Sequence, residues 1–528
     1  MSAAADIIAS GSASLGIELG STRIKACLVG ENPAEVLAVG GFEWENQLVD
    51  GLWSYDLADV WTGLAAAVAE LRAEVKEKHG VELTSLRSVG VSAMMHGYLA
   101  FDSNDELLVP FRTWRNTNTG DAAAQLTELF GVNIPLRWSI AHLQQVIGEG
   151  ADHVSHVSFV TTLAGYVHWK LTGEKVLGIG DASGMFPIDT DTHDYESSMI
   201  SAFDSLDTSS VLCCSVKELL PRVLVAGEHA GVLTAEGAAL LDPSGGLEAG
   251  AQMCPPEGDA GTGMVATNAV APRTGNISAG TSIFAMVVLE RPLAGVHHEL
   301  DVVTTPLGDT VAMVHCNNGA SELAAWVGMF RRFAELAGTG LDSDGVYDLL
   351  FTEALAGETD AGGLVAYNYL AGEPITGITE GRPLFVRTPE STFSLANAIR
   401  AQLYGVFGTL SIGMRVLDEE GVELDRMSAH GGMFRTAGVA QRFLAAAIGA
   451  PVSVAQSASE GGAWGIAVLA AFAASDHADL ASFLDDIVFA DAPTETVEPQ
   501  PDDVAGFAQF LERYRSGLPV EAAATTSL

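Results

Sequence analysis

Near the start of the 528-residue chain lies the sequence Leu15-Gly16-Ile17-Glu18-Leu19-Gly20-Ser21-Thr22-Arg23-Ile24-Lys25. Its apolar run over residues 15–19 stops at Gly-Ser-Thr and resumes over 24–29, which is typical of two buried strands joined by a tight turn. A similar pattern recurs about half a chain later, where Ile277 leads into Gly280-Thr281-Ser282 and an apolar run over 283–289. We therefore predict two domains of similar plan, with a boundary between residues 265 and 275.

Amphipathic helices are predicted between the strand-like segments. Residues 57–78 carry apolar side chains at alternating steps of three and four, and Gly80 is a suitable stop. A second stripe of this kind runs over residues 395–417, and short strand-like segments lie at 88–91 and 452–454. This alternation of strands and helices predicts layered α/β domains.

Four parts are expected along the chain. They are a loose leader over residues 1–14, an N-terminal domain over 15–267, a C-terminal domain over 268–510 and a tail over 511–528. The leader lacks the basic and apolar regions of a secretory signal, and no apolar run in the sequence is long enough to cross a bilayer. Five cysteines without C-x-x-C spacing fit reduced thiols, so we expect a cytoplasmic protein.

The charge balance restricts the partners. Lys plus Arg total 26 and Asp plus Glu total 67, which gives a net charge of -41 and excludes nucleic acid and anionic membrane as expected partners. The electric field of this negative charge would also repel a nucleotide. A phosphate site must therefore gather positive character from backbone N–H groups, a few cations or a metal.

The two hairpin turns are the candidate phosphate sites. Gly20, Ser21 and Thr22 offer N–H groups and hydroxyls to a phosphate, while Glu18 could orient a magnesium ion through water. An ordinary hairpin is the alternative, because short Gly/Ser/Thr turns are common. The second turn, Gly280-Thr281-Ser282, repeats the same residue types and favours phosphate binding.

Asp259 is the candidate general base. It lies in Gly258-Asp259-Ala260-Gly261-Thr262-Gly263, shortly before the second hairpin, where it could accept the proton of an attacking hydroxyl. The alternative is a turn aspartate that caps a helix. The sequence contains no G-K-[ST] at P-loop spacing, which excludes a Walker-type site.

Two polar segments suit a sugar. Met95 and His96 follow a buried strand, and Trp114, Arg115 and Asn116 offer an indole face with guanidinium and amide donors. A satisfied core histidine is the alternative for His96.

A third segment suits a nucleotide base. Gly431 and Gly432 end a predicted strand and would let a flat ring approach the backbone, with Met433 and the helix that contains Gln441 following.

Together and in this order, the segments resemble the FGGY carbohydrate kinase family, with xylulokinases as the most similar members. The resemblance rests on eight segments. They are ELGSTRIK at 18–25, MHG at 95–97, RTWRNT at 112–117, GDASG at 180–184, GDAGTG at 258–263, SAGTS at 278–282, YLAGE at 369–373 and AHGGMFRT at 429–436.

The resemblance implies an actin-like (ribonuclease-H-like) fold of two α/β domains with a catalytic cleft between them. It also implies ATP and Mg²⁺ as cofactors, a small sugar as partner and Asp259 as the base. The two hairpins, with Lys25, would hold the phosphates, and the 431–433 segment with Gln441 would lie on the adenine side. We expect transfer of the γ-phosphoryl group to a keto-sugar, with D-xylulose first. Ribulose, a deoxy sugar, glycerol or gluconate are alternatives, as is a non-catalytic nucleotide-binding sensor; a homodimer stays open.

Five residues at four places depart from the family pattern. Glu18 stands where the family usually has Asp, and Met94 stands where xylulokinases usually have Gln. Arg115-Asn116 replaces a frequent Asn-Asp, and Tyr404 replaces a frequent Glu in the long helix of the second domain. The first departure bears on the metal and activity, and Met94 and Arg115-Asn116 bear on the identity of the sugar.

Overall fold

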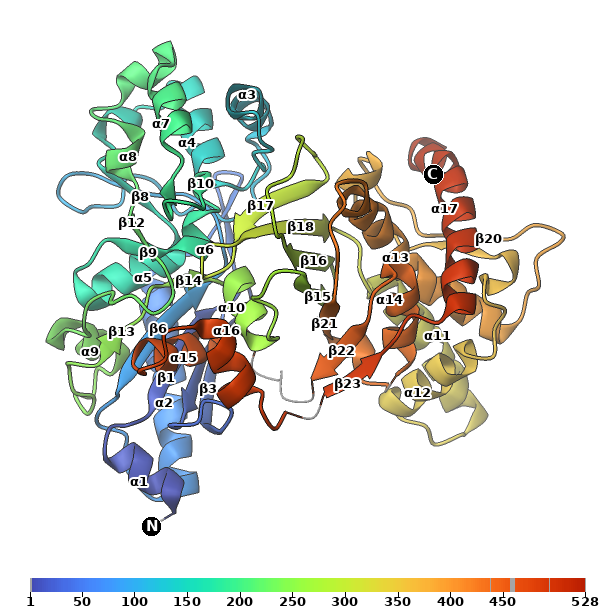
Figure 1. Ribbon diagram of the computed structural model, residues 1–528, viewed down its shortest axis with the longest axis horizontal. Helices are drawn as coiled ribbons and strands as arrows, with labels where there is room; N and C mark the ends of the chain where they lie inside the picture. The colour runs from blue at the N-terminus through green and yellow to red at the C-terminus, as the bar shows by residue number, and fades with distance from the viewer. Residues whose placement is uncertain (1, 437, 456–460, 493, 528) are drawn as a thin grey trace. The chain divides into compact units, whose positions relative to one another are not determined.

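The computed structural model describes every residue except 1, 437, 456–460, 493 and 528, and the chain divides into two compact units (Figure 1). Unit 1 comprises Met1–Val270, Val302–Val311 and Ala458–Ala492. Unit 2 comprises Ala271–Asp301, Ala312–Ser457 and Pro493–Leu528. The chain thus leaves unit 1 inside the predicted boundary region but later returns to it, which a single boundary at 267/268 does not anticipate.

Unit 1 is built on a six-stranded sheet that contains the first predicted hairpin. β1 (Ser14–Leu19) pairs antiparallel with β2 (Arg23–Val29) and parallel with β6 (Ser88–Ala93). β3 (Val36–Glu43) extends the sheet beyond β2, while β13 (Gln252–Met253) and β14 (Glu257–Gly258) pair with β6. Nearly every residue of β1 and β6 is buried, as expected for central strands covered on both faces.

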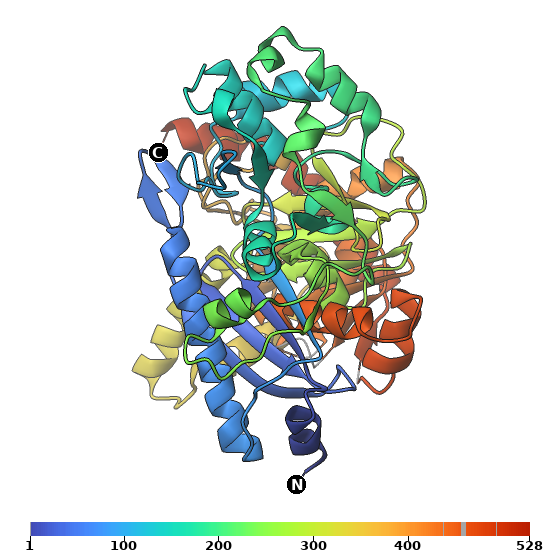
Figure 2. The same ribbon diagram turned by 90° about the vertical axis from the view of Figure 1, so that its left-hand side faces the viewer.

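Helices cover this sheet because its strands carry apolar side chains on both faces. The predicted first helix is α2 (Leu57–His79), which ends at Gly80 with φ +71 and packs along β3 (Figures 1 and 2). α15 (Gly461–Ala473) packs so closely on β1 that a Cβ on Gly16 would lie 2.1 Å from the Ala463 carbonyl oxygen. This close contact explains why residues 458–492 belong to unit 1.

The other elements of unit 1 are short helices and strands, and the strands form separate two-stranded sheets. The helices are α3 (Gly120–Phe130), α4 (Ser139–Gly148), α5 (Leu163–Thr172), α6 (Ile179–Ala182), α7 (Ser197–Asp204), α8 (Val216–Leu219), α9 (Ala235–Leu241), α10 (Asp259–Ala266) and α16 (Leu480–Phe483). The short strands are β4 (Gln47–Val49), β5 (Leu52–Ser54), β7 (Leu99–Phe101), β8 (Phe159–Thr161), β9 (Val176–Gly178), β10 (Ile188–Asp189), β11 (Asp194–Tyr195) and β12 (Arg222–Leu224).

Unit 2 repeats the plan of the first sheet. β15 (Thr274–Ala279) pairs antiparallel with β16 (Ile283–Val288) and parallel with β21 (Arg426–His430), as β1 does with β2 and β6. The complete order of this sheet is β17-β18-β16-β15-β21-β22-β23, which adds β17 (Leu300–Thr304), β18 (Thr310–Cys316), β22 (Val452–Ala455) and β23 (Thr494–Val497). The end of β17 and the start of β18 fall within Val302–Val311, which is counted with unit 1. The two α/β units of similar plan predicted from the hairpins are therefore confirmed.

Long helices fill unit 2 around one apolar core. The second predicted helix is α13 (Leu395–Glu419), capped by Ser394 and buried over most of its length. The unit also contains α11 (Ser321–Ala337), α12 (Ser343–Ala354), α14 (Val439–Ile448), α17 (Pro501–Ser527) and the small hairpin of β19 (Val365–Tyr367) and β20 (Leu384–Val386).

Both chain ends differ from the sequence expectation. Within residues 1–14, Ala3–Ala9 form helix α1, capped by Ser2, and Ile8 is buried in the core of unit 1. The expected tail from 511 onward belongs to α17, where Tyr514 is buried and Glu521 accepts a hydrogen bond from the Arg382 N–H at 2.7 Å. Burial of a few apolar residues orders both segments.

Candidate active site

Asp259 begins helix α10 directly after β14, whose residues pair with the end of β6. Its Oδ1 accepts a hydrogen bond from the Met95 N–H at 3.1 Å, while the residue itself is exposed beside buried strand ends. Desolvation by the surrounding protein raises the pKa of Asp259 above its ordinary value, against the lowering effect of the N–H groups of Met95 and Ala260. An anchored, accessible carboxylate of this kind can accept a proton from a bound hydroxyl.

Met95 and His96 form the turn that follows β6, beside Asp259. His96 has φ +71, a left-handed conformation that is uncommon outside glycine, and Gly97 follows with φ +101. The His96 Nδ1 lies 3.3 Å from the Gly184 carbonyl oxygen, and its ring stacks on Trp138 with centroids 6.5 Å apart. Sequence reasoning did not assign Trp138 a role. The turn is thus fixed by two distant segments, 138 and 184.

The Trp114–Asn116 segment is held against Trp53. The amide of Asn116 is buried and fully engaged, since it accepts from the Trp53 N–H at 2.8 Å and donates to the carbonyl oxygens of Trp53 and Thr113. Arg115 stacks over the Trp53 ring at 4.4 Å, and Trp114 is 36% exposed. Asn116 thus holds the loop in place with both of its amide hydrogens, and its contact with a sugar stays a prediction.

The first hairpin turn is held by aromatic side chains. The Gly20 carbonyl accepts from Trp44 Nε1 at 2.8 Å, and the Ser21 carbonyl accepts from the Tyr55 hydroxyl at 2.6 Å. Thr22 lies exposed at the tip. The turn backbone is therefore rigid while its outer side remains accessible.

Glu18 and Lys25 lie opposite each other across β1 and β2, with Glu18 Oε2 3.9 Å from Lys25 Nζ. The Glu18 carboxylate also lies against the start of α15, where a Cβ on Gly462 would be 2.4 Å from Oε1. One carboxylate and one ammonium group therefore lie on the two strands that the first turn connects.

The second hairpin turn and the glycine segment meet in unit 2. The Thr281 carbonyl accepts from the Gly319 N–H at 2.7 Å, which fixes the turn, and Thr281 itself is exposed. β15 and β21 run side by side, so Gly431, with φ +123, packs so closely that a Cβ there would lie 2.1 Å from the Ala279 carbonyl oxygen. Gly432 borders open space. The predicted phosphate turn and adenine-side glycines are therefore neighbours.

Met433 and Gln441 lie beneath this surface. Met433 is buried in the core of unit 2, and the Gln441 amide donates to the carbonyl oxygens of Val452 and Glu495 at 2.8 and 2.7 Å. Gln441 ties β22 to β23, so both residues support the segment from below. Contact of these two residues with a nucleotide stays a prediction.

Two buried carboxyls beside Asp259 were not assigned a role from sequence. Glu257 immediately precedes Gly258-Asp259, and Asp181 lies in the GDASG segment; both are at most 1% exposed. Burial raises the pKa of Asp181 to about 7, and the charge of Asp259 adds to the rise against the Thr162 hydrogen bond. Burial also raises the pKa of Glu257 to about 8, with a further contribution from Asp181. Such shifts cluster at functional sites.

Family models and sequence relatives of this chain agree on one protein family. The N-terminal domain of the FGGY family of carbohydrate kinases matches residues 13–247, and its C-terminal domain matches residues 275–474. A xylulose kinase from Haemophilus influenzae is 20% identical over 431 residues, covering 79% of this chain and 82% of that protein.

Two solved structures share the fold. The xylulose kinase from Lactobacillus acidophilus, with ligand bound, has a TM-score of 0.78 at 16% identity and covers 97% of this chain and 99% of its own. The gluconate kinase from the same organism has a TM-score of 0.78 at 17% identity and covers 97% and 98%.

Two α/β units of similar plan with these matches define a phosphotransferase that acts on carbohydrates. Because the matches span most of its length, the chain belongs to the FGGY family of carbohydrate kinases, which use ATP. Among the described residues, no helix combines the length and apolar character needed to cross a membrane.

Proposed function

We propose that this kinase transfers the γ-phosphoryl group of ATP to a hydroxyl of a small keto-sugar, with Asp259 as general base and D-xylulose as the first candidate. The observation that carries the proposal is the position of Asp259: an exposed carboxylate, anchored by the Met95 N–H and next to the His96 turn. The xylulose kinases among the similar proteins support the choice of sugar.

The chemistry assigned to Asp259 is a single proton transfer. As the sugar oxygen attacks the γ-phosphorus, its proton passes to the Asp259 carboxylate, and the bond from the γ-phosphorus to the bridging oxygen breaks to release ADP. Met95 and His96 would hold the sugar beside the base, and Trp114 offers an exposed indole face. Positioning of this kind supplies much of the acceleration in phosphoryl transfer.

The residues for phosphate and magnesium fit these ligands by their chemistry. In the described part of the chain, no three acidic, His or Cys side chains gather as a metal cluster. Magnesium at kinase sites needs only one or two carboxylates together with substrate phosphates and water, so Glu18 suffices as the protein's contribution. A bound Mg²⁺ would neutralise phosphate charge. Lys25 and the turns at Gly20-Ser21-Thr22 and Gly280-Thr281-Ser282 would provide the remaining donors, with Gly431 and Gly432 beside the adenine.

Gluconate is the second candidate substrate, because a gluconate kinase is equally similar in fold. Ribulose, a deoxy sugar and glycerol remain alternatives. A nucleotide sensor without kinase activity is a further alternative that the Glu18 departure favours.

The test is ADP release from ATP, with and without Mg²⁺, across pentuloses, hexuloses, polyols and sugar acids. We expect the largest Mg²⁺-dependent stimulation from D-xylulose. A larger stimulation by gluconate would replace the proposed sugar but keep the reaction. ATP binding without turnover on any compound would favour the sensor.

A further inference from the structure

Glu257 and Asp181 form a buried carboxyl pair directly behind the proposed base. The Glu257 carboxylate accepts the N–H of Gly180 at 3.2 Å and the N–H of Asp181 at 2.9 Å. It lies so close to that segment that a Cβ on Gly178 would be 2.3 Å from Glu257 Oε1. The pair therefore joins β14, which leads into Asp259, to the start of the 180–184 segment.

The same segment supports the proposed sugar side. The Gly184 carbonyl lies 3.3 Å from His96 Nδ1, and a Cβ on Gly184 would be 2.4 Å from that nitrogen. On the other side, a Cβ on Gly258 would lie 2.8 Å from the Met95 side chain and 3.2 Å from Asp181 Oδ1. A shift of residues 180–184 relative to Glu257 must therefore disturb His96, Met95 and Asp259 together.

The buried pair lies without a cation among the residues that the structure describes. Among the described residues, neither carboxyl forms an ion pair, and Asp181 Oδ1 is buried without a hydrogen-bond partner, while its Oδ2 accepts from the Thr162 hydroxyl at 2.6 Å. The titratable groups that face the pair are Cys254, Tyr195 and Asp259. His96 and Arg137 lie beyond them, on Met95 and Asp259 respectively. Two buried negative charges in such surroundings would be costly, and a retained proton avoids that cost.

We propose that Asp181 and Glu257 share at least one proton in the active enzyme and act as positioning residues that hold the Asp259 and Met95-His96 segments in register. The proposal rests on the proposed role of Asp259. When the last shared proton leaves, the two carboxylates repel each other, and the 180–184 segment separates from β14. Activity then falls at alkaline pH although Asp259 itself stays ionised.

The raised pKa values of the two carboxyls set the pH range over which the pair loses its protons. Both carboxyls have raised pKa values, about 7 for Asp181 and about 8 for Glu257, and these belong to the pair as a coupled unit. A carboxyl with a raised pKa contributes stability that is complete below its ordinary range and is lost as pH rises through the raised value. Stability should therefore fall from about pH 4, the ordinary range of a carboxyl, to about pH 8 and level off above it, whereas activity should fall above about pH 7 as the protons leave.

The test variant is Asp181→Asn, which keeps shape and can still accept the Thr162 hydrogen bond. Its matched control is Asp56→Asn, the same chemical change at the exposed N-cap of α2, where Asn caps as well as Asp. For both variants and wild type, kcat and the thermal unfolding midpoint are measured from pH 6 to 9.5 with the best sugar from the panel.

We expect wild type and Asp56→Asn to lose kcat about tenfold per pH unit at the alkaline end, and their unfolding midpoint to fall from pH 6 to about pH 8 and then level off. Asp181→Asn should lessen the decline in both, because Glu257 then titrates without a neighbouring carboxylate to repel. If it unfolds at every pH, Glu257→Gln makes the same test by removing the other charge. An alkaline decline in Asp181→Asn identical to that of wild type overturns the proposal. If no sugar is phosphorylated, the midpoints alone still decide on the pair, so its failure is distinct from failure of the proposed kinase reaction.

Discussion

The two units treat buried charge in opposite ways. In unit 1, Asp181 and Glu257 are buried without any ion pair among the described residues. In unit 2, Asp503 is also fully buried, yet its two oxygens lie 2.6 Å from Arg400 Nη2 and 2.5 Å from Arg442 Nε. The pKa directions follow: burial alone would raise the pKa of Asp503, but the two guanidinium groups lower it, whereas the pKa values of the unit 1 pair are raised.

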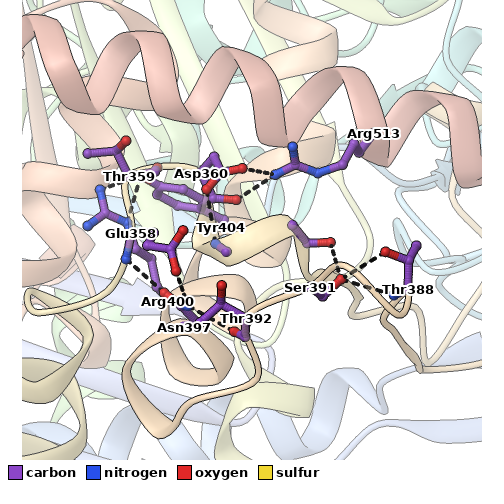
Figure 3. A network of polar contacts seen from close by, with 12 residues as sticks. Glu358, Thr359, Asp360, Thr388, Ser391, Thr392, Asn397, Arg400, Tyr404 and Arg513 are labelled. Atoms are coloured by element: carbon purple, nitrogen blue, oxygen red, sulfur yellow. Dashed lines mark hydrogen bonds and ion pairs between the residues drawn. The ribbon is translucent and has the colours of Figure 1, made fainter.

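In unit 2, Asp503, Arg400 and Arg442 form a cluster that holds helices together, which we call the unit 2 joint. Arg400 on α13 also donates to the Tyr404 hydroxyl, which in turn donates to the Thr359 carbonyl at 2.9 Å (Figure 3). Tyr404 is the residue that replaces a frequent Glu, and Asp503 on α17 supplies the carboxylate that Arg400 needs. These ion pairs connect three helices, α13 through Arg400, α14 through Arg442 and α17 through Asp503. The comparison indicates that a buried carboxylate paired with cations holds helices together. A buried carboxyl without a counter-ion instead marks a site whose protonation state affects structure and activity.

The largest effect is expected from breaking the unit 2 joint. Asp503→Ala leaves Arg400 buried without its carboxylate and should cost about 3–5 kcal/mol in the free energy of unfolding. Asp502→Ala, an exposed change one residue earlier in the same helix, should cost little. The measurement is a urea titration with hydrogen exchange of α13 and α17 peptides. Equal exchange in the two variants would show that the joint does not hold the helices.

A second contrast lies in the pH dependence. A carboxyl with a lowered pKa contributes stability that is present above its ordinary range near 4 and is lost as pH falls through the lowered value, so unit 2 should weaken at acid pH. The slope reaches about 1.4 kcal/mol per pH unit for one proton. Hydrogen exchange of α17 in the native state between pH 6 and 3 measures it. An α17 that weakens only at alkaline pH would erase the contrast with unit 1.

A smaller change sharpens the role of Tyr404. Tyr404→Phe removes the hydroxyl that accepts from Arg400 and donates to Thr359, while the ring keeps its contacts with Phe443 and Phe507. We expect a loss of about 1–2 kcal/mol, because one buried hydrogen-bonding group is removed. Tyr347→Phe, in a half-buried tyrosine on α12, is the control and should change little. Equal losses of unfolding free energy in the two variants would mean that the Tyr404 hydroxyl does not stabilise the unit 2 joint.

The local parts of the fold follow well from the sequence. Both hairpins begin and end within a few residues of the predicted positions, because strand–turn–strand patterns are encoded by neighbouring residues. Helices α2 and α13 follow from their apolar spacing in the same way. The sequence likewise indicates the proposed site at Asp259, which directly follows β14, and at His96, which lies shortly after β6 of the same sheet.

The parts that sequence reasoning missed depend on residues far apart in the chain. The Asn116 amide hydrogen-bonds to the Trp53 backbone, and the Gln441 amide hydrogen-bonds to the carbonyl oxygens of Val452 and Glu495. Sequence spacing does not reveal these contacts. The return of residues 458–492 to unit 1 depends on packing of α15 against β1. The pairing of Asp181 with Glu257 joins segments 76 residues apart, through the hydrogen bond at the Asp181 N–H. GDASG was recognisable as a motif, but its partner was not.

The most direct test of the account is turnover in Asp259→Asn. The substitution keeps the shape that accepts the Met95 N–H but removes the proton acceptor, so kcat should fall about 10²–10⁴-fold while ATP affinity, measured by calorimetry, stays close to wild type. Asp56→Asn is the control for the loss of one charge. Near-normal turnover of Asp259→Asn with the best sugar would contradict the assignment of Asp259 as the base.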